Sequence, residues 1–401
     1  MLKRITVLAL VQIMLVALSC NKIKSITGSS MLKLFPVKIG TSFGYINREG
    51  KILINPQFSD ATIFREGLAL VKSSTDDPKW GFINEAGKYI ISPIYNQATV
   101  FSDGLAWVVA ENESPTAIDK QGNIKFTMTE AVEVNIFREG LASFAILDNY
   151  EKKWGFIDKT GKIVIIPQFS KVKTFSEGQC AFKNGEGKWG YIDKKGNITI
   201  NPQFDEADNI IKGNAVVKTG GKSGVINAKG LYTVNPIYKT IINDHKICLT
   251  ELDGKWGWCD SEGKTIINNQ FKEALMFLEN DLAPVKIGNK FGYINKEGKI
   301  VINPQFETAF SFNGNLAMVE TSNKIGFINN EGKYIINPQF DAASADVILY
   351  LIRNDLSSNM TVKTEYVPEA ESANYPEPEY NQDNYEEAAP AVEEAPAEAA
   401  H

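Results

Sequence analysis

The chain has 401 residues, of which 43% are hydrophobic and 22% are charged, a composition typical of globular proteins and long enough for several domains or one repeat array. Its formal net charge of −6 is unevenly spread, because residues 365–401 hold 11 acidic residues and no lysine or arginine, which leaves a mildly basic body. Only two histidines occur, His245 and His401, which excludes a His-rich metal site and leaves little scope for a Ser-His-Asp triad.

A signal sequence is predicted at the N-terminus. Lys3 and Arg4 precede an apolar run over residues 5–18, which is too short to span a bilayer comfortably. Ser19 and Cys20 follow at the point where the sequence turns polar, and this arrangement resembles the signal of bacterial lipoproteins. An ordinary secretory signal that ends in a cysteine by chance is the alternative.

The lipoprotein resemblance implies that residues 1–19 are removed and that Cys20 becomes the acylated N-terminus. Two or three acyl chains bury enough methylene groups to anchor a protein stably, whereas one chain does not. Residues 20–33 are then the lipidated cysteine and a short flexible tether. The expected location is an exported, lipid-anchored place in the bacterial cell envelope, with the membrane and its face left open.

The body of the chain is a tandem repeat. The turn pattern [Asn/Asp]-x-x-Gly occurs nine times, with 33 to 39 residues between successive glycines. Asn or Asp at the first position accepts backbone hydrogen bonds, and Gly at the fourth takes the left-handed conformation of a bulged hairpin. The predicted structural glycines are Gly50, Gly87, Gly122, Gly161, Gly196, Gly230, Gly263, Gly298 and Gly332.

Each repeat is predicted to be a three-stranded antiparallel meander. Short runs rich in Ile, Tyr, Phe, Val and Trp flank each turn, as at 79–83 and 88–91, and a third run precedes them, as at 68–72. A second tight turn, Phe-x-x-Gly, comes before that third run, as at 64–67. Both faces of the strands carry apolar residues, so neighbouring repeats must stack to bury them.

The repeat resembles the WG (KWG) repeat of bacterial proteins, in which Lys-Trp-Gly-Phe/Tyr-Ile precedes the turn and Ile-x-Pro-Gln-Phe follows it. The similarity covers residues 34–353. Phe43 and Phe291 replace the Trp in two repeats, while Thr116-Ala117, Ser223 and Ile325 depart further. The resemblance implies a β-rich interaction scaffold with no shared catalytic residues and no cofactor. The Trp-Gly pair is complete at Trp80-Gly81, Trp154-Gly155, Trp189-Gly190 and Trp256-Gly257.

The predicted fold class is all-β, with about nine repeats of about 35 residues each. We expect an open, curved stack or solenoid rather than a closed propeller-like ring. Propellers usually have four to eight blades of four strands each and repeats of 40 or more residues. The array is expected to be monomeric.

Residues 354–401 are predicted to be a disordered acidic tail. The segment is rich in Ala, Glu and Pro and almost lacks branched aliphatic residues, so it cannot bury enough surface to offset the entropy of ordering. A solvated tail is the simplest interpretation. A peptide ligand for another envelope protein, or for the basic body itself, is the alternative.

One tryptophan is a candidate contact residue for a partner. The Trp-Gly tryptophans recur at one strand position and are interpreted as core. Trp107 instead lies between Ala106 and Val108, in a slot that varies between repeats. An outward Trp on a single repeat would be a candidate anchor for a partner, and partial burial at a sheet junction is the alternative.

Lysines and cysteines also follow the repeat. Lysines precede the Trp-Gly slot and follow the turn glycine, so stacked repeats would align them in basic rows. Such rows protect strand edges and aid solubility, or attract an anionic polymer such as an acidic glycan. Cys180, Cys248 and Cys259 stand in core slots. Cys248 and Cys259 lie on neighbouring strands of one meander, and a disulfide between them is left open.

The favoured function is a non-enzymatic, lipid-anchored envelope scaffold that binds a protein or glycan partner through its repeat surface. A carbohydrate-active enzyme hidden in the β array and a purely structural spacer are the alternatives. Nucleic acid is disfavoured because the body is nearly balanced in charge and exported. The sequence holds no P-loop and no calcium loop, and its core slots stay apolar, so neither a catalytic residue nor a metal ligand is predicted.

Overall fold

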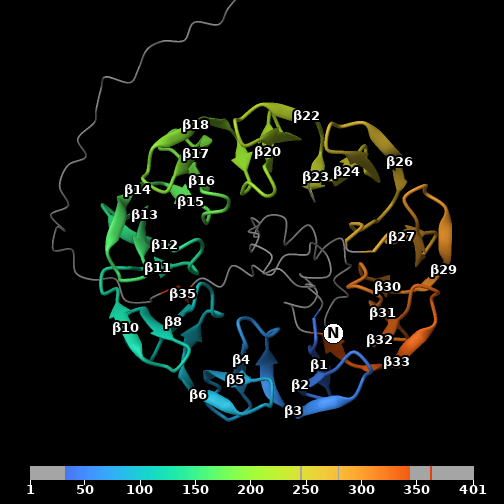
Figure 1. The fold of residues 1–401 in the computed structure, drawn as a ribbon, viewed down its shortest axis with the longest axis horizontal. Helices are drawn as coiled ribbons and strands as arrows, with labels where there is room; N and C mark the ends of the chain where they lie inside the picture. Colours follow the sequence, from blue (N-terminus) through green and yellow to red (C-terminus); the bar gives the residue numbers. More distant parts are fainter. Residues whose placement is uncertain (1–31, 244–245, 279, 344–361, 364–401) are drawn as a thin grey trace, which may run out of the picture. The chain divides into compact units, whose positions relative to one another are not determined.

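The structure is a computed structural model that describes residues 32–243, 246–278, 280–343 and 362–363. These residues form β-strands, turns and loops, and no helix occurs among them. The described residues of 32–343 build nine small antiparallel units, one for each sequence repeat and here called sheets, arranged around a centre (Figure 1). Strand β3 joins the first two of them into one seven-stranded sheet. The prediction of an all-β tandem repeat is confirmed.

Each sheet has a core of three strands, which follow one another in the chain from the inner to the outer edge of the sheet. They are called the second, third and outer strands, because most sheets also have a short first strand before them. The second strands are β1 (Phe35–Ile39), β4 (Leu68–Ser73), β8 (Leu105–Val109), β12 (Leu141–Asp148), β16 (Gln179–Lys183), β20 (Asn214–Thr219), β24 (Ile247–Leu252), β27 (Ala283–Ile287) and β31 (Ala317–Thr321). The third strands are β2 (Ser42–Ile46), β5 (Trp80–Asn84), β9 (Thr116–Asp119), β13 (Glu151–Asp158), β17 (Trp189–Asp193), β21 (Lys222–Asn227), β25 (Lys255–Asp260), β28 (Lys290–Ile294) and β32 (Lys324–Ile328). The outer strands are β3 (Ile52–Ala61), β6 (Tyr89–Tyr95), β10 (Ile124–Thr127), β14 (Ile163–Phe169), β18 (Ile198–Phe204), β22 (Tyr232–Tyr238), β26 (Thr265–Phe271), β29 (Ile300–Phe306) and β33 (Tyr334–Phe340).

Most sheets also have a short first strand, which the sequence did not predict. The outer strand of one sheet leads almost directly into this strand at the inner edge of the next sheet. Between the first two sheets, the long strand β3 serves both, because Phe58 pairs with Phe43 and also with Ser73. The separate first strands are β34 (Ala342–Ala343), β7 (Gln97–Ala98), β11 (Glu133–Val134), β15 (Lys171–Val172), β19 (Glu206–Ala207), β23 (Thr240–Asn243) and β30 (Thr308–Ala309).

The glycine of the Trp-Gly pair has a steric role at a bulge. In the fourth repeat Trp154 pairs with Phe169 and Phe156 with Ile165, so the outer strand carries extra residues around Pro167. A Cβ on Gly155 would lie 2.5 Å from the carbonyl oxygen of Ile165 and 2.7 Å from the nitrogen of Pro167. Only glycine lets the two backbones approach so closely.

The third repeat shows the converse. Thr116 stands in place of the glycine, and Met128 in place of the proline. Here Thr116 pairs directly with Thr127, without the bulge that the other repeats have at this point. Glycine and bulge are therefore lost together, which explains why this repeat tolerates a Cβ.

The nine turn glycines join consecutive repeats. All nine have positive φ, between 76° and 90°, which confirms the turn prediction. The Cα of each also lies against an outer-strand side chain of the preceding repeat: a Cβ on Gly87 would be 3.0 Å from Ile54, and one on Gly332 2.8 Å from Ile302. A side chain here would be strained and crowded at once.

The array closes on itself, so the expectation of an open stack is wrong. Strand β34, which follows the ninth repeat, pairs antiparallel with β1 of the first repeat. One apolar cluster contains Phe35 and Ile46 together with Phe327 and Ile336. Arg48 donates one hydrogen bond to the carbonyl oxygen of Asn313 at 2.8 Å and another to its Oδ1 at 3.1 Å. The nine repeats thus form a ring, in which strand β34 from the end of the array pairs with the sheet of the first repeat.

The predicted tail lies outside the described residues except for one short strand. β35 (Val362–Lys363) pairs antiparallel with β11, where Val362 is opposite Val134 and Lys363 is opposite Glu133. It adds a fifth strand at the inner edge of the fourth sheet. The signal and tether predicted for residues 1–31 lie outside the described residues.

Candidate partner-binding face

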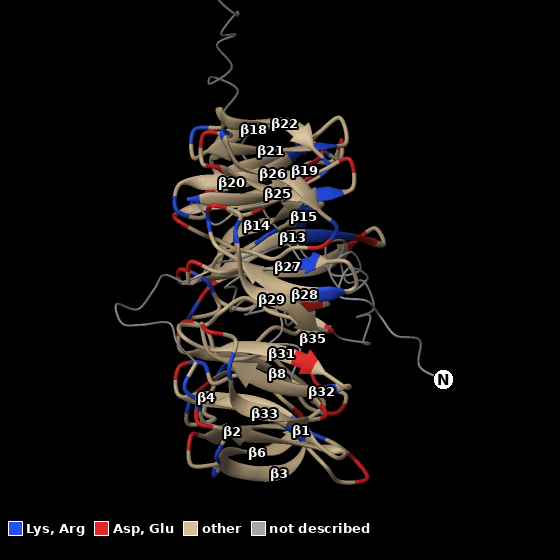
Figure 2. Ribbon diagram, turned by 90° about the vertical axis from the view of Figure 1, so that its right-hand side faces the viewer, with Lys and Arg blue, Asp and Glu red and all other residues tan. Residues whose placement is uncertain are grey.

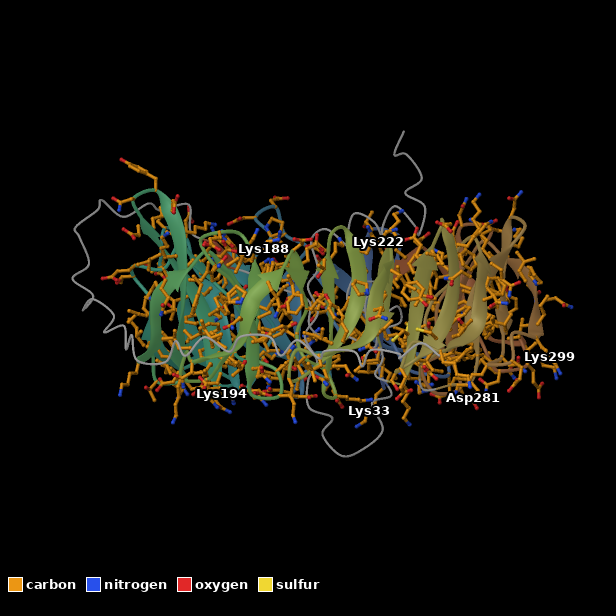
Figure 3. All side chains as sticks on the ribbon, turned by 90° about the horizontal axis from the view of Figure 1, so that it is seen from above. Lys33, Lys188, Lys194, Lys222, Asp281 and Lys299 are labelled. Carbon is orange, nitrogen blue, oxygen red and sulfur yellow. The ribbon has the colours of Figure 1, made fainter. Side chains whose placement is uncertain are left out.

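The ring has two loop-bearing faces. One, here the hairpin face, consists of the loops that join the second and third strands and carries Lys188 and Lys222 at the top of Figure 3. The other, the turn face, carries the [Asn/Asp]-x-x-Gly turns, with Lys194 and Lys299 at the bottom of Figure 3. Strand side chains fill the spaces between sheets, so these faces hold the residues that vary most freely.

The lysine row on the hairpin face is largely neutralised. Lys188 contacts Asp205 at 2.7 Å and Lys324 contacts Asp341 at 2.5 Å. Lys290 lies 3.8 Å from Glu307. In each pair the acid follows the Pro-Gln-Phe segment of the same repeat. The row is therefore a line of ion pairs, which weakens the case for an anionic polymer along its length.

Trp107 does not lie on either face, so its predicted outward position is wrong. Its side chain has no solvent exposure. The indole Nε1 donates a hydrogen bond to the carbonyl oxygen of Asn135 at 2.9 Å, and the ring stacks on Phe137 with centroids 5.4 Å apart. Trp107 is an inter-repeat core residue that ties the third sheet to the fourth.

One hairpin differs from the others on its face. Strands β12 and β13 have eight residues each, whereas β16 and β17 have five each. Beyond the pair Ala145 and Trp154, the hairpin continues through Ile146–Lys153, Leu147–Lys152 and Asp148–Glu151. Figure 2 shows the hairpin that contains β13 reaching beyond the loops on either side of it.

The tip of this hairpin presents a strained, exposed tyrosine. Asn149 and Tyr150 have φ of 49° and 64°, and Tyr150 is 98% exposed. A two-residue turn with both φ values positive normally takes Asn-Gly, and a bulky residue in this region is a true outlier. Equivalent tips carry small residues, such as Asp253-Gly254 and Ser322-Asn323. Folding gains nothing from an aromatic ring at this position, because the ring is in solvent.

The base of the same hairpin is firmly held. Ile146 is buried, and Leu147 packs against the apolar cluster of the fourth and fifth repeats. Lys152 contacts Glu133 at 2.6 Å. The tyrosine is therefore carried on a rigid stalk rather than on a loose loop. Sequence reasoning missed it, although the interval from Gly122 to Gly161 is the longest between turn glycines, at 39 residues.

Carboxylates in the Phe-x-x-Gly turns connect neighbouring repeats, because each accepts a hydrogen bond from the turn glycine of the next repeat. Asp103 accepts a hydrogen bond from the amide of Gly140 at 2.7 Å, and Glu139 accepts one from Gly178 at 2.9 Å. Burial raises the pKa of Glu139, but its hydrogen bonds from Gly178 and Lys194 outweigh that effect, so the pKa lies below its ordinary value. These acids hold the ring together, which accounts for them without a catalytic role.

Among the described residues, the remaining candidates form no recognisable reaction centre. Cys180, Cys248 and Cys259 are buried free thiols in this structure, so the disulfide left open for Cys248 and Cys259 is not formed here. His245 and Cys20 lie outside the described residues. Within the part of the chain that the structure describes, no three His, Cys, Asp or Glu side chains cluster as metal ligands. No helix there is long and apolar enough to cross a membrane.

Comparison with known proteins supports the repeat assignment. A family model described as a WG-containing repeat matches residues 43–73, 80–113, 154–188, 189–222, 256–291, 291–324 and 325–345, more than half of the chain. The matches leave out residues 114–153 and 223–255, yet β9 and β10, and β21 and β22, pair there as in the other repeats. No curated protein matches the chain.

Solved structures resemble the ring at low sequence identity. A eukaryotic initiation factor has a TM-score of 0.55 and 12% identity, with 78% of this chain and 97% of that chain covered. The computationally designed Ika8 protein has a TM-score of 0.41 and 10% identity over 76% and 98% of the two chains. BamB from Moraxella catarrhalis has a TM-score of 0.37 and 10% identity over 78% and 98%. The similarity to the initiation factor shows the fold alone.

Proposed function

Because the chain belongs to the WG-repeat family, we propose that it is a non-enzymatic scaffold of the bacterial envelope that presents its hairpin face to a protein partner. Acylation of Cys20 would anchor it to a membrane, so that the ring is held at the surface by a tether. The lipoprotein-like sequence around Cys20 supports the anchor, and the ring of structural repeats supports the scaffold.

A single observation carries the choice of contact site. Tyr150 is strained and 98% exposed at the tip of the longest hairpin. Strained backbone is typical of functional sites, where it persists because the surrounding structure enforces it. Tyrosine is also among the residues that dominate binding energy at protein interfaces. We therefore place Tyr150 at the centre of the contact surface, in the role first considered for Trp107.

The charges around Tyr150 favour a protein over an anionic glycan. Asp148 and Glu151 stand beside Lys152 and Lys153 at the tip, and Lys153 contacts Glu151 at 3.0 Å. Such mixed charge suits a polar rim of an interface. An anionic glycan is the alternative partner, and its binding would fall steeply as salt rises.

The test uses a variant that removes the ring and relieves the strain together. The full chain with Tyr150→Gly should keep its fold, because Asn-Gly is the preferred pair for this turn. The matched control is Asn323→Gly, which places glycine at another hairpin tip with positive φ. Tethered wild-type and variant chains would be used to capture proteins from envelope extracts and, separately, purified envelope glycans.

We expect Tyr150→Gly to lose about tenfold or more in capture of a discrete protein, while Asn323→Gly matches the wild type. Equal capture by all three chains would reject Tyr150 as the contact. Capture of glycans alone, lost in high salt, would replace the protein partner by an anionic polymer. Absence of any captured component would favour the structural spacer.

A further inference from the structure

One pair of facing core positions departs from the pattern of the repeats. In antiparallel register, the second and third strands of most sheets oppose a small residue to an isoleucine, as in Ala69–Ile83, Ala215–Ile226 and Ala283–Ile294. In the first sheet the isoleucine is kept and Phe35 is opposite Ile46. The fifth sheet keeps the isoleucine, with Cys180 opposite Ile192. In the seventh sheet alone both positions change, and Cys248 is directly opposite Cys259.

Packing explains the first of these cysteines but not the second. Cysteine fits an alanine slot, as Cys180 shows. At position 259 cysteine replaces the branched isoleucine found in all eight other repeats. Losing those side-chain carbons from a fully packed core is costly. A paired change that packing does not favour points to chemistry between the two thiols.

The geometry allows a covalent bond. Directly opposed residues of an antiparallel pair have Cα atoms about 4.5–5.5 Å apart, within the range of about 4.4–6.8 Å that disulfides span. Both side chains are buried, in a cluster with Tyr238 and Ile241. Cys248 donates a hydrogen bond to Asn243 Oδ1 at 3.4 Å. Hydrogen bonding to Cys248 lowers the pKa of Cys259, which favours the attacking thiolate.

The junction that would be strengthened lacks the usual aromatic pair. In the sixth sheet Ser223 is opposite Tyr238, where three other repeats place Trp opposite Phe. The cluster that joins the sixth sheet to the seventh contains both cysteines. A covalent bond at this place would compensate for the missing tryptophan.

We infer that Cys248 and Cys259 are a disulfide site, closed when the protein folds in an oxidising compartment. The inference of closure in the cell rests on the proposed export. Two thiols lose two protons and two electrons to a disulfide oxidant, such as an oxidised dithiol protein or oxidised glutathione. The oxidant is reduced to two thiols, and one S–S bond forms between β24 and β25. Cys180 has no facing cysteine and stays reduced.

The test maps the thiols of the full chain in two preparations. One is isolated from the envelope of producing cells after trapping with N-ethylmaleimide, and the other is a Cys20→Ser chain refolded with oxidised and reduced glutathione. Peptide mass spectrometry should find Cys248 linked to Cys259 in both, with Cys180 alkylated after unfolding. Reductant should lower the melting temperature of the wild type but not of Cys259→Ile, which restores the residue of the other repeats.

If Cys248 and Cys259 are found unlinked in both preparations, the disulfide site is rejected. Linkage in the refolded chain but not in the cellular one would support the site and count against export, so the two proposals can fail separately. The Cys180→Ala chain is the matched control. It should show the same linkage and the same response to reductant as the wild type, and a lost linkage there would assign the bond to Cys180 and reject the pair.

Discussion

Gly50 of the first repeat lies against Ile336 of the last, since a Cβ built on Gly50 would be 3.0 Å from Ile336 Cγ1. Each of the other eight turn glycines lies in the same way against the repeat before it in sequence. The joint between the chain's two ends is therefore built like the joints between consecutive repeats. A closed ring follows from this equivalence, because no end repeat is left with an uncovered apolar face.

Closure can be tested with two matched aspartates. Asp341 accepts hydrogen bonds from the amide of Gly40 at 2.8 Å and from Lys324 at 2.5 Å. Asp205 accepts bonds of the same kind from Gly220 and Lys188, both at 2.7 Å, at an interior joint. If the ring is closed in solution, Asp341→Asn and Asp205→Asn should lower the melting temperature to a similar degree. A loss for Asp205→Asn alone would show that the ring is open.

The same carboxylate predicts a pH dependence. The hydrogen bond from Lys324, followed by that from Gly40, holds the pKa of Asp341 below its ordinary value. A lowered folded-state pKa stabilises the fold above the unfolded-state pKa, and this stabilisation is lost as pH falls through the folded value. The difference in melting temperature between wild type and Asp341→Asn should therefore be full at neutral pH and shrink in acid. A difference independent of pH would exclude the ionised carboxylate as its source.

The Trp-Gly glycine should be intolerant of even one added carbon where the proline bulge is present. In Gly155→Ala the new Cβ would be 2.5 Å from Ile165 O, so the outer strand must shift, at a cost of about 1–3 kcal/mol in the free energy of unfolding. The third repeat gives the control, since Thr116 already carries a Cβ in the glycine slot, and Thr116→Ala removes only its hydroxyl and one methyl group, at a cost of about 0.5–1.5 kcal/mol. Urea denaturation measures both. Equal losses would argue that the bulge does not require glycine.

Trp107→Ala should destabilise the ring. The residue is fully buried, stacked on Phe137, and hydrogen-bonded to Asn135. Truncating a buried tryptophan costs about 3–5 kcal/mol. Trp154→Ala, at a Trp-Gly tryptophan that is also buried, provides the comparison in the same denaturation series. A Trp107→Ala chain as stable as the wild type would restore the outward position.

The sequence predicts the repeats well because their determinants are local. Positive φ at Gly87 and Gly122 follows from turn chemistry within four residues. The second and third strands follow from apolar runs such as Leu68–Ser73. First strands such as β7, with two residues, are too short to leave a pattern in the sequence. They form because the outer strand of one sheet is carried to the edge of the next.

Ring closure and the burial of Trp107 could not be predicted from the sequence, because both depend on how neighbouring repeats pack. Whether nine repeats meet end to end depends on a small rotation between neighbours, accumulated around the whole array, and no single turn records it. Trp107 looks exceptional because its slot holds smaller residues elsewhere. Its burial depends on the carbonyl oxygen of Asn135, which the next sheet brings to it. Tyr150 is hard to predict because its importance lies in backbone strain, which the residue letters do not show.

Anchoring is predicted from the resemblance around Cys20 alone and is testable without the ring. Acylation places hydrocarbon on the N-terminal cysteine, and two or three chains give stable membrane binding. In detergent phase separation of cell extracts, the wild type should enter the detergent phase and Cys20→Ala the aqueous phase. Cys180→Ala is the control for a cysteine that receives no lipid. A wild type that carries no labelled fatty acid would refute the anchor.

The final prediction concerns the stability of the strained hairpin. An L-residue in the left-handed region costs about 1–2 kcal/mol relative to glycine, and Tyr150 holds a φ of 64° while its ring is 98% exposed. Because the ring makes little contact to lose, Tyr150→Gly should raise the free energy of unfolding, offset in part by the greater entropy of glycine in the unfolded chain. Tyr150→Ala keeps most of the strain and should give no such gain. A gain for glycine but not alanine, measured by urea denaturation alongside the capture experiment, would show that the chain carries the tyrosine at the expense of its own stability. If both variants are less stable than the wild type, the ring has a packing role, and the argument for Tyr150 as a contact residue fails.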